Sequence, residues 1–256
     1  MTWNKLKNFL IGLFVCINIF LIINTISIYN SYKLSDSIIN STCDLLKNSG
    51  ITIKSDIIPK SLPSFESAEF EPVDANDISI INEYTTEIDG TITFIINRKD
   101  FYKKNTLEIF KNLGFDKKSI KIVSDSIKNG VRYINCNQHY NKKTVYSSYI
   151  NAEITKNGVA KISFKWYNVT DGYNTEAVNG EPVFASSVLI DFINLEERQS
   201  ESKNITSVET GYFIPSFATN GEVRTISAIP AYCIKTDDGK SYCFNAYNGS
   251  FTGSFN

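Results

Sequence analysis

The side chains best able to do chemistry in this chain are one histidine, five cysteines and scattered carboxylates. With a single histidine, His139, a histidine-based metal cluster is impossible, and a Ser-His-Asp triad has only one possible base. His139 and Cys136 share the polar run Asn135–His139, but closeness along the chain does not create the geometry of a Cys-His pair. We interpret this run as a solvated loop.

The common signatures of enzyme active sites are also absent. The sequence contains no GxxxxGK, GxGxxG, GxSxG, HExxH or paired CxxC pattern, which excludes the usual phosphate, dinucleotide, hydrolase and zinc motifs. Asp237 and Asp238 stand directly before Gly239, where aspartate is favoured as a turn former. The formal net charge of -1 gives no electrostatic reason to expect nucleic acid as a partner. We therefore predict a protein without enzymatic activity, cofactor or metal.

A possible disulfide lies in the closing hairpin, predicted over residues 231–247. With Asp237-Asp238-Gly239 as a three-residue loop, Cys233 lies opposite Cys243 at a non-hydrogen-bonded position, where Cα atoms approach to about 4.5 Å. A cross-strand disulfide and two reduced thiols are both compatible with this register. The pattern assigns no partner to Cys43 or Cys136.

The N-terminal region contains a long apolar run, residues 9–29, which carries no charge and is dominated by Ile, Leu, Phe and Val. As a helix it would be roughly 31 Å long, which matches the hydrocarbon core of a bilayer. Lys5 and Lys7 precede the run, whereas Lys33 on its far side is balanced by Asp36. The positive bias predicts a cytoplasmic tail at 1–8, a transmembrane helix at 9–29 and an exported remainder in a single-pass membrane protein.

A cleaved signal peptide is the other explanation of the same run. Such peptides have an apolar region of about 7–15 residues and a small-x-small cleavage site. This run is longer, and Asn24-Thr25-Ile26-Ser27 is a poor cleavage site. Attachment of a lipid at Cys16 would need a small residue where Val15 stands. We therefore predict an uncleaved anchor in the lipid bilayer.

Asn18 lies near the middle of the predicted span, where water is least available. An asparagine in lipid is unfavourable unless its amide finds a partner, and such residues often bond across helices. Asn18 could instead be merely tolerated. We expect Asn18, with its apolar neighbours Phe14 and Leu21, to contact a second transmembrane helix, because such contacts give about 1–2 kcal/mol in model peptides.

The exported part has the pattern of an α+β protein. Residues 30–50 read as a juxtamembrane helix or linker that ends at Gly50, with an apolar stripe formed by Leu34, Ile38, Leu45 and Leu46. The further elements expected are strands at 51–58, 91–97, 119–123, 145–155 and 206–214, helices at 99–113 and 183–197, and a surface loop or irregular edge strand at 66–77. We predict two subdomains, 51–130 and 131–256, each with an antiparallel sheet and one covering helix.

The turn Lys156-Asn157-Gly158 fixes the register of one hairpin. A two-residue Asn-Gly turn would pair Ile154 with Lys161 and so mix apolar with polar side chains. A three-residue loop with Gly158 in the left-handed bulge position instead pairs Ile154 with Ala160. Because a slip of one residue turns every side chain to the other face, we predict the second register.

Several short motifs lie at the two ends of the chain and after residue 50. They are the opening Met1–Lys7 with Ile17–Leu21, the segment Ile51–Ile53 leading to Ile57–Pro59, and the tail segments Ala228–Tyr232, Thr236–Lys240 and Phe244–Gly249. Together they resemble the YycH/YycI family, and its YycI-like members in particular. The matches occur in order over most of the chain. Tyr232-Cys233 departs from the family pattern, in which a basic residue is expected after the aromatic one, so a family role for that basic residue has no support here.

The resemblance implies an accessory membrane protein of the essential cell-wall two-component system of low-GC Gram-positive bacteria. It implies an ectodomain similar to YycH modules, a transmembrane helix that contacts a sensor histidine kinase, and a YycH-like membrane protein as partner. The family is not known for catalysis. We therefore expect a regulatory membrane protein with its C-terminal domain outside the cell. The alternatives are a membrane-tethered binding module for peptide or cell-wall fragments and, ranked last, an anchored hydrolase.

Overall fold

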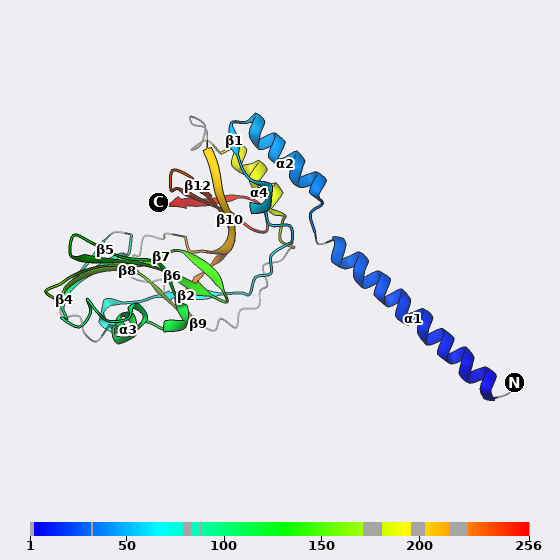
Figure 1. The fold of residues 1–256 in the computed structure, drawn as a ribbon, viewed down its shortest axis with the longest axis horizontal. Coiled ribbons are helices and arrows are strands. Elements are labelled where there is room, and N and C mark those ends of the chain that lie inside the picture. The colour runs from blue at the N-terminus through cyan, green and yellow to red at the C-terminus, as the bar shows by residue number, and fades with distance from the viewer. Residues whose placement is uncertain are drawn as a thin grey trace.

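The chain folds as a mixed α+β protein, the predicted class, in which one long N-terminal helix projects from a curled β-sheet domain (Figure 1). A computed structural model describes residues 3–31, 33–78, 83–87, 89–170, 181–195, 203–215 and 225–255. The helices are α1 (Trp3–Ser31), α2 (Asp36–Asn48), α3 (Thr106–Asn112) and α4 (Ala185–Ile193), with short 3-10 turns η1 (Ser55–Ile57), η2 (Ala75–Asp77) and η3 (Lys117–Ser119). The strands are β1 (Ile51–Thr52), β2 (Glu69–Pro72), β3 (Tyr84–Thr86), β4 (Ile92–Asn97), β5 (Ile120–Lys128), β6 (Val131–Tyr140), β7 (Lys143–Thr155), β8 (Val159–Lys165), β9 (Tyr167–Thr170), β10 (Lys203–Phe213), β11 (Ile226–Ser227), β12 (Ile229–Thr236), β13 (Ser241–Asn245) and β14 (Phe251–Phe255).

Helix α1 contains the apolar run and stands apart from the folded domain. Its segment Lys7–Ile26 has a mean hydropathy of 2.5, and none of it is buried against the rest of the protein. By length and composition this segment could cross a membrane, and a membrane anchor and a signal sequence both have these properties. A soluble domain rarely exposes so much contiguous apolar surface, and the described residues outside α1 do not cover it.

Helix α2 ends just before Gly50 as predicted, but it begins only at Asp36 and buries a different stripe. The Ser35 hydroxyl caps its first turn by accepting from the Ile38 N–H, and Gly50 follows its end with a φ of 76°, the left-handed conformation that favours glycine. Ile39, Thr42 and Leu46 face the core. The predicted stripe was wrong at Ile38 and Leu45, which are about half exposed (51% and 50%), because the face that α2 shows to α4 is set by tertiary packing.

Eleven strands form one continuous mixed sheet, in which β7 is shared by two parts. Its residues Thr144–Tyr146 pair in parallel with Gly211–Phe213 of β10, whereas Tyr149–Ile154 pair antiparallel with β8. A bulge separates the two stretches, and Ser147 within it has a φ of 71°. The Ser148 hydroxyl donates to the Val145 carbonyl, 2.7 Å away, and so closes the bulge locally.

The two parts are each a helix followed by a four-stranded antiparallel meander. In the distal unit, α3 precedes β5–β6–β7–β8, and β4 and β3 extend the sheet beyond β8. In the proximal unit, α4 precedes β10–β12–β13–β14, and α2 packs beside α4. Each unit has its own apolar core, centred on Phe110 and Phe164 in the distal unit and on Phe192 and Tyr242 in the proximal unit.

A second, small sheet lies against the junction of the two units. Its order is β11–β2–β9, and its central residue Phe70 is fully buried beside Val145 of β7 and Tyr212 of β10. The run 66–77 was expected to be a surface loop or an irregular edge strand. It instead supplies the central strand of this sheet, because the side chain of Phe70 packs in the core. The acidic residues on both sides of Phe70 made the run read as a surface segment in the sequence.

The division into units differs from the predicted boundary between residues 130 and 131. That boundary falls in the turn between β5 and β6, which pair along their whole length in one unit. The proximal unit combines residues 34–58 with α4, β10 and β12–β14, so it is discontinuous in sequence. Strand pairing across a parallel β7–β10 contact is long-range, and local patterns do not reveal it.

Helix α3 is shorter than predicted, because the residues before Thr106 form turns held by Arg132. The Arg132 guanidinium donates to the carbonyls of Phe101, Tyr102 and Lys104 and forms a 2.6 Å ion pair with Asp125. Hydrogen bonding from Arg132 holds the pKa of Asp125 below its usual range. The apolar residue Phe101 is therefore buried from a turn, not from the helix that its spacing suggested.

Both predicted hairpin registers are confirmed. Ile154 pairs with Ala160 in the β7–β8 hairpin, and Cys233 pairs with Cys243 in the β12–β13 hairpin. The predicted strand 51–58 is reduced to Ile51–Thr52 followed by a 3-10 turn, because only those two residues find a partner strand, in parallel with β10.

Substitution Gly211→Ala tests the junction between the two units. An added Cβ at this position would overlap the Thr144 carbonyl oxygen and the Tyr146 ring, so β10 could not approach β7. Overpacking of this kind costs about 1–3 kcal/mol, and we expect the thermal midpoint of the full chain in detergent to fall by about 3–10 °C. Glu209→Ala, at an exposed neighbouring position of β10, is the matched control. An unchanged midpoint for Gly211→Ala would show that the β7–β10 pairing does not support the fold.

Candidate membrane-contact and ligand-binding sites

The predicted contact residues of the N-terminal helix lie on one exposed face. Phe14, Asn18 and Leu21 follow the i, i+4, i+7 spacing of a helical face, and Phe14 and Leu21 are 62% and 54% exposed. The Asn18 side-chain amide donates to the Phe14 carbonyl, 2.8 Å away within the same helix. This bond uses one of the two amide protons, so a second donor and the amide oxygen remain available for a partner helix.

The polar run around His139 was expected to be a loop, but it forms the C-terminal half of β6. His139 is paired opposite Thr144 of β7, and its Nε2 lies 3.1 Å from the Thr144 hydroxyl. Burial, with the nearby charge of Lys121, lowers the pKa of His139, while Glu209 opposes this shift. The imidazole is therefore a half-buried structural group in the sheet, and its partner is a threonine hydroxyl.

Cys136 lies on the same strand but on the face that forms the distal core. It is 1% exposed, and burial raises the pKa of its thiol to about 12. A thiol with such a pKa is almost entirely protonated near neutral pH and does not act as a nucleophile. The structure thus separates Cys136 from His139 by strand alternation, and it does not assemble a Cys-His pair. Among the described residues, no group of three or more His, Cys, Asp or Glu side chains is arranged to hold a metal ion.

The closing hairpin brings its two cysteines together and anchors its turn with an ion pair. Cys233 and Cys243 are bonded as a disulfide with their Cα atoms 4.1 Å apart, and both are buried. In the turn, Asp238 accepts from the Thr236 hydroxyl and binds the Lys203 ammonium at 2.5 Å. Lys203 holds the pKa of Asp238 well below its usual range. Asp238 therefore stabilises the turn and links it to Lys203 of β10.

The mass of the intact protein tests the disulfide. The chain has five cysteines, of which Cys16, Cys43 and Cys136 are free thiols. Alkylation of the unreduced, denatured chain should therefore modify three cysteines, and alkylation after reduction should modify five. Loss of the short-loop disulfide in a Cys233→Ala/Cys243→Ala variant should cost at most about 3 kcal/mol of stability. Five modified cysteines without reduction would show two thiols in place of the disulfide.

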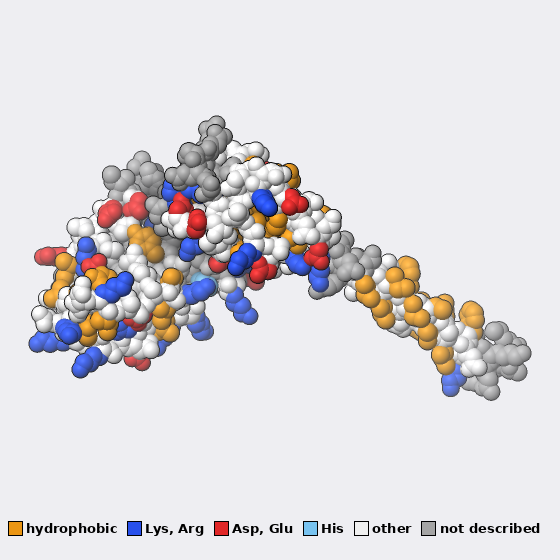
Figure 2. Space-filling model, turned by 45° about the horizontal axis from the view of Figure 1, so that its top comes forward, with side chains coloured by type: hydrophobic (Ala, Val, Ile, Leu, Met, Phe, Trp, Pro, Cys, Tyr) orange, Lys and Arg blue, Asp and Glu red, His pale blue; other side chains and the backbone are white. Residues whose placement is uncertain are grey.

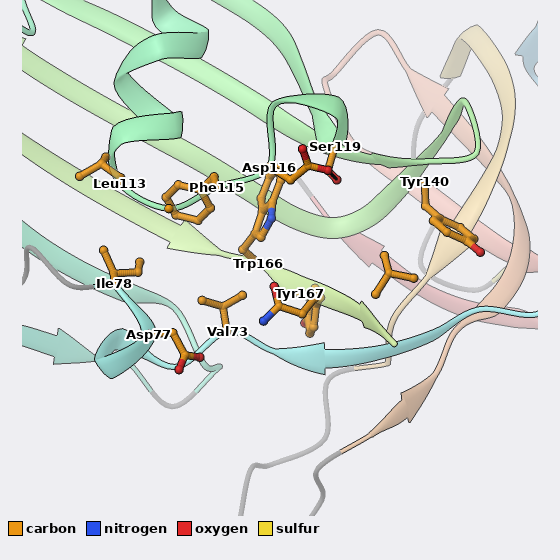
Figure 3. Close-up of a pocket in the computed structure, with 13 residues that line it drawn as sticks. Val73, Asp77, Ile78, Leu113, Phe115, Asp116, Ser119, Tyr140, Trp166 and Tyr167 are labelled. Carbon is orange, nitrogen blue, oxygen red and sulfur yellow. Dashed lines mark hydrogen bonds between the residues drawn. The ribbon is translucent and has the colours of Figure 1, made fainter. Parts of the chain in front are cut away.

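A cavity of about 660 Å³ opens between the α3–β5 loop and the small sheet (Figure 3). Four segments distant in sequence form its wall: Val73, Asp77 and Ile78; Leu113–Asp116 with Ser119; Tyr140; and Trp166–Val169. Figure 3 shows Trp166 and Phe115 side by side in this wall, and their rings meet edge to face at 5.6 Å. The volume falls within the range of ligand pockets in proteins.

The cavity combines an apolar wall with two carboxylates. Asp77 and Asp116 line it from the η2 and η3 sides, and each also accepts a backbone N–H of its own turn, from Asp74 and Lys118 respectively. Carboxylates in a cavity wall attract cationic groups. The wall therefore suits a ligand with an apolar stem and an amine. In the same wall the Ser119 hydroxyl donates to the Asp116 carboxylate, 3.2 Å away.

The sequence did not indicate this cavity, because no motif links its four segments. The only local signals were single residues: Trp166 directly after a strand, and aspartates at short turns. Both are common in ordinary structural positions, so only the packing of the small sheet against the distal unit identifies them as one site.

Comparisons with known proteins leave the family of this chain open. No family model and no curated protein matches it. A solved structure described as an uncharacterized protein from Eubacterium rectale ATCC 33656 has a TM-score of 0.46 at 10% identity and covers 86% of this chain and 99% of its own. The C-terminal domain of YpeB from Bacillus megaterium has a TM-score of 0.34 at 7% identity and covers 88% and 98%. Values this low carry no argument about function, and the resemblance to the YycH/YycI family stays a prediction.

Proposed function

We propose that this chain is a membrane-anchored regulatory protein whose N-terminal helix contacts the transmembrane helices of a sensor histidine kinase. The observation that carries the proposal is α1 itself. Over Lys7–Ile26 it is apolar and wholly unburied, so it needs an environment or partner outside its own domain. The charge bias before the apolar run favours a cytoplasmic N-terminus and a domain outside the cell.

The contact surface in this proposal is the face formed by Phe14, Asn18 and Leu21. A polar amide between two large apolar side chains gives a helix pair both packing and a directional bond, and the available amide groups of Asn18 would fix its register. A regulator of this kind acts by binding one arrangement of the kinase helices better than the other. The YycH/YycI resemblance supports the choice of kinase and adds a YycH-like membrane protein as the second partner.

The Asn18→Leu variant tests the helix contact. We expect co-purification with the kinase in detergent to fall by about tenfold, since loss of about 1–2 kcal/mol corresponds to that change. Asn24→Leu is the matched control, because six residues along a helix place it on a different face. Replacement of residues 9–29 by an unrelated span should abolish signalling. Signalling that survives both Asn18→Leu and the replacement would contradict the helix contact and show that α1 serves only as a membrane anchor.

A second candidate function is ligand binding by the exported domain, and the 660 Å³ cavity favours it. In this case the helix holds a binding module at the membrane, and the occupant carries an amine that the carboxylates at Asp77 and Asp116 attract. Lysine-containing peptides, including the stem peptides of cell walls, have this chemistry.

Trp166 provides a direct reporter for this cavity. The chain has two tryptophans, so Trp3→Phe in the full chain leaves Trp166 as the only one. A lysine-containing stem tetrapeptide should change its fluorescence with a saturable dependence on concentration. The added substitution Asp77→Asn should weaken binding about tenfold, because it removes the charge and keeps an acceptor for the Asp74 N–H. Asp44→Asn on the surface of α2 is the control. Fluorescence of Trp166 that does not change with the peptide would show that the cavity does not bind it.

A further inference from the structure

The positive charges of this chain are concentrated in one stretch, although the net charge is close to zero. Residues 98–165 carry 15 Lys or Arg and only 5 Asp or Glu, whereas the whole chain carries 26 and 27. This stretch forms α3 and the β5–β8 meander. Figure 2 shows many Lys and Arg side chains along the margin of the molecule that lies away from α1. The distal unit is therefore cationic.

Most of these cations are not neutralised within the distal unit. Arg98, Lys104, Arg132 and Lys165 form ion pairs, and Lys143 lies over the Phe65 ring. The other ten are exposed lysines without an ion pair to a described residue: Lys99, Lys103, Lys111, Lys117, Lys118, Lys121, Lys128, Lys142, Lys156 and Lys161. Two of them, Lys121 and Lys128, stand near the two ends of β5.

Strand β5 is an open edge of the sheet. Among the described residues it pairs with β6 alone, through eight of its nine residues with a bulge at Val123, and its other side has no partner strand. The turn to β6 consists of Asn129 and Gly130, both with positive φ, which is a two-residue turn. Residues that flank such a turn exchange backbone hydrogen bonds, and the pattern alternates along the strands. The backbone N–H and C=O of Ile127 and Asp125 therefore point to the open side.

The side chains of β5 differ between its two faces. Lys121, Ser124, Ser126 and Lys128 lie on the face away from α3, since they pair with residues of β6 that alternate with the core residues Ile134 and Cys136. Ile122 and Ile127 lie on the face toward α3, but α3 does not cover them, and they are 41% and 60% exposed. An added strand would thus meet polar and cationic side chains on one face and apolar ones on the other.

The register also sets the length of an added strand. Lys121 and Lys128 pair with Asn137 and Val131 of β6, which are the two ends of a seven-residue stretch. A regular strand of seven residues therefore reaches from one lysine to the other. Acidic side chains at its two ends would lie beside the two lysines. Lysines on an edge strand repel cationic strands, and they leave acidic ones as the favoured class.

We propose that the open edge of β5 binds an extended acidic segment of a partner protein by strand addition, with alternating apolar residues facing Ile122 and Ile127. Two observations favour a protein strand over a plain polyanion: the outward backbone groups of β5 and its exposed isoleucines, neither of which a phosphate polymer would use. The inference does not depend on α1, so it can fail or succeed independently of the proposed kinase contact.

The test uses a labelled peptide, acetyl-Glu-Val-Thr-Val-Thr-Val-Glu-amide, and the full chain in detergent, followed by fluorescence anisotropy. The peptide is a palindrome, so it presents the same side chains to β5 in either direction. We expect saturable binding of this peptide and at least tenfold weaker binding of the lysine version, Lys-Val-Thr-Val-Thr-Val-Lys. In Lys121→Glu/Lys128→Glu the preference should reverse. Lys47→Glu/Lys240→Glu, which changes exposed lysines in the proximal unit, should keep the original preference.

A second variant pair separates strand addition from simple charge attraction. Ile127→Pro removes an N–H that points to the open side and leaves the β5–β6 hydrogen bonds in place, and proline is tolerated at such edge positions. We expect Ile127→Pro to weaken binding of the acidic peptide at least tenfold and Ile127→Val to leave it within about twofold. Should Ile127→Pro prevent folding, the charge reversal remains decisive. Equal binding of the two peptides by the unaltered protein, or unchanged binding by folded Ile127→Pro, would overturn the proposal.

Discussion

The fold depends on the double pairing of β7. One part of this strand pairs with β10 and the next with β8, so a single chain segment must satisfy two partners that diverge in space. The bulge with Ser147 at positive φ supplies the change of direction, and the Gln138 side chain completes the junction. Its amide donates to the Tyr167 carbonyl at 2.6 Å and accepts from the Tyr167 N–H, as a backbone partner would. Without these contacts, the two helix-plus-meander units would have no continuous sheet between them.

The junction also explains where the binding features lie. The small sheet of β2, β9 and β11 packs against the point where β7 meets β10, and the space between this sheet and the α3–β5 loop is the 660 Å³ cavity. The far edge of the distal unit, at β5, remains open and cationic. Helix α1 leaves from the proximal side of the domain (Figure 1). The exposed apolar helix, the cavity and the open strand edge thus lie on different parts of the molecule.

Sequence patterns predicted those elements whose partners are close along the chain. The two hairpin registers followed from the turn residues and from the alternation of apolar side chains, because a one-residue slip would expose the whole set. The predictions for His139 and for residues 66–77 were wrong for one reason. In both runs polar residues outnumber apolar ones, yet a strand needs only one buried position in two, and Phe70 and Cys136 supply it.

The sequence by itself determined the apolar N-terminal helix, the α+β class and the excess of lysine in residues 98–165, because each is a property of composition or of local periodicity. Only the tertiary structure decided that the strands form one curled sheet, that four distant segments enclose a cavity, and that β5 is left at an edge. The physical reason is that these features arise from pairings between residues far apart in the chain, such as Gly211 with Thr144. Nothing in the local pattern of either strand specifies its partner.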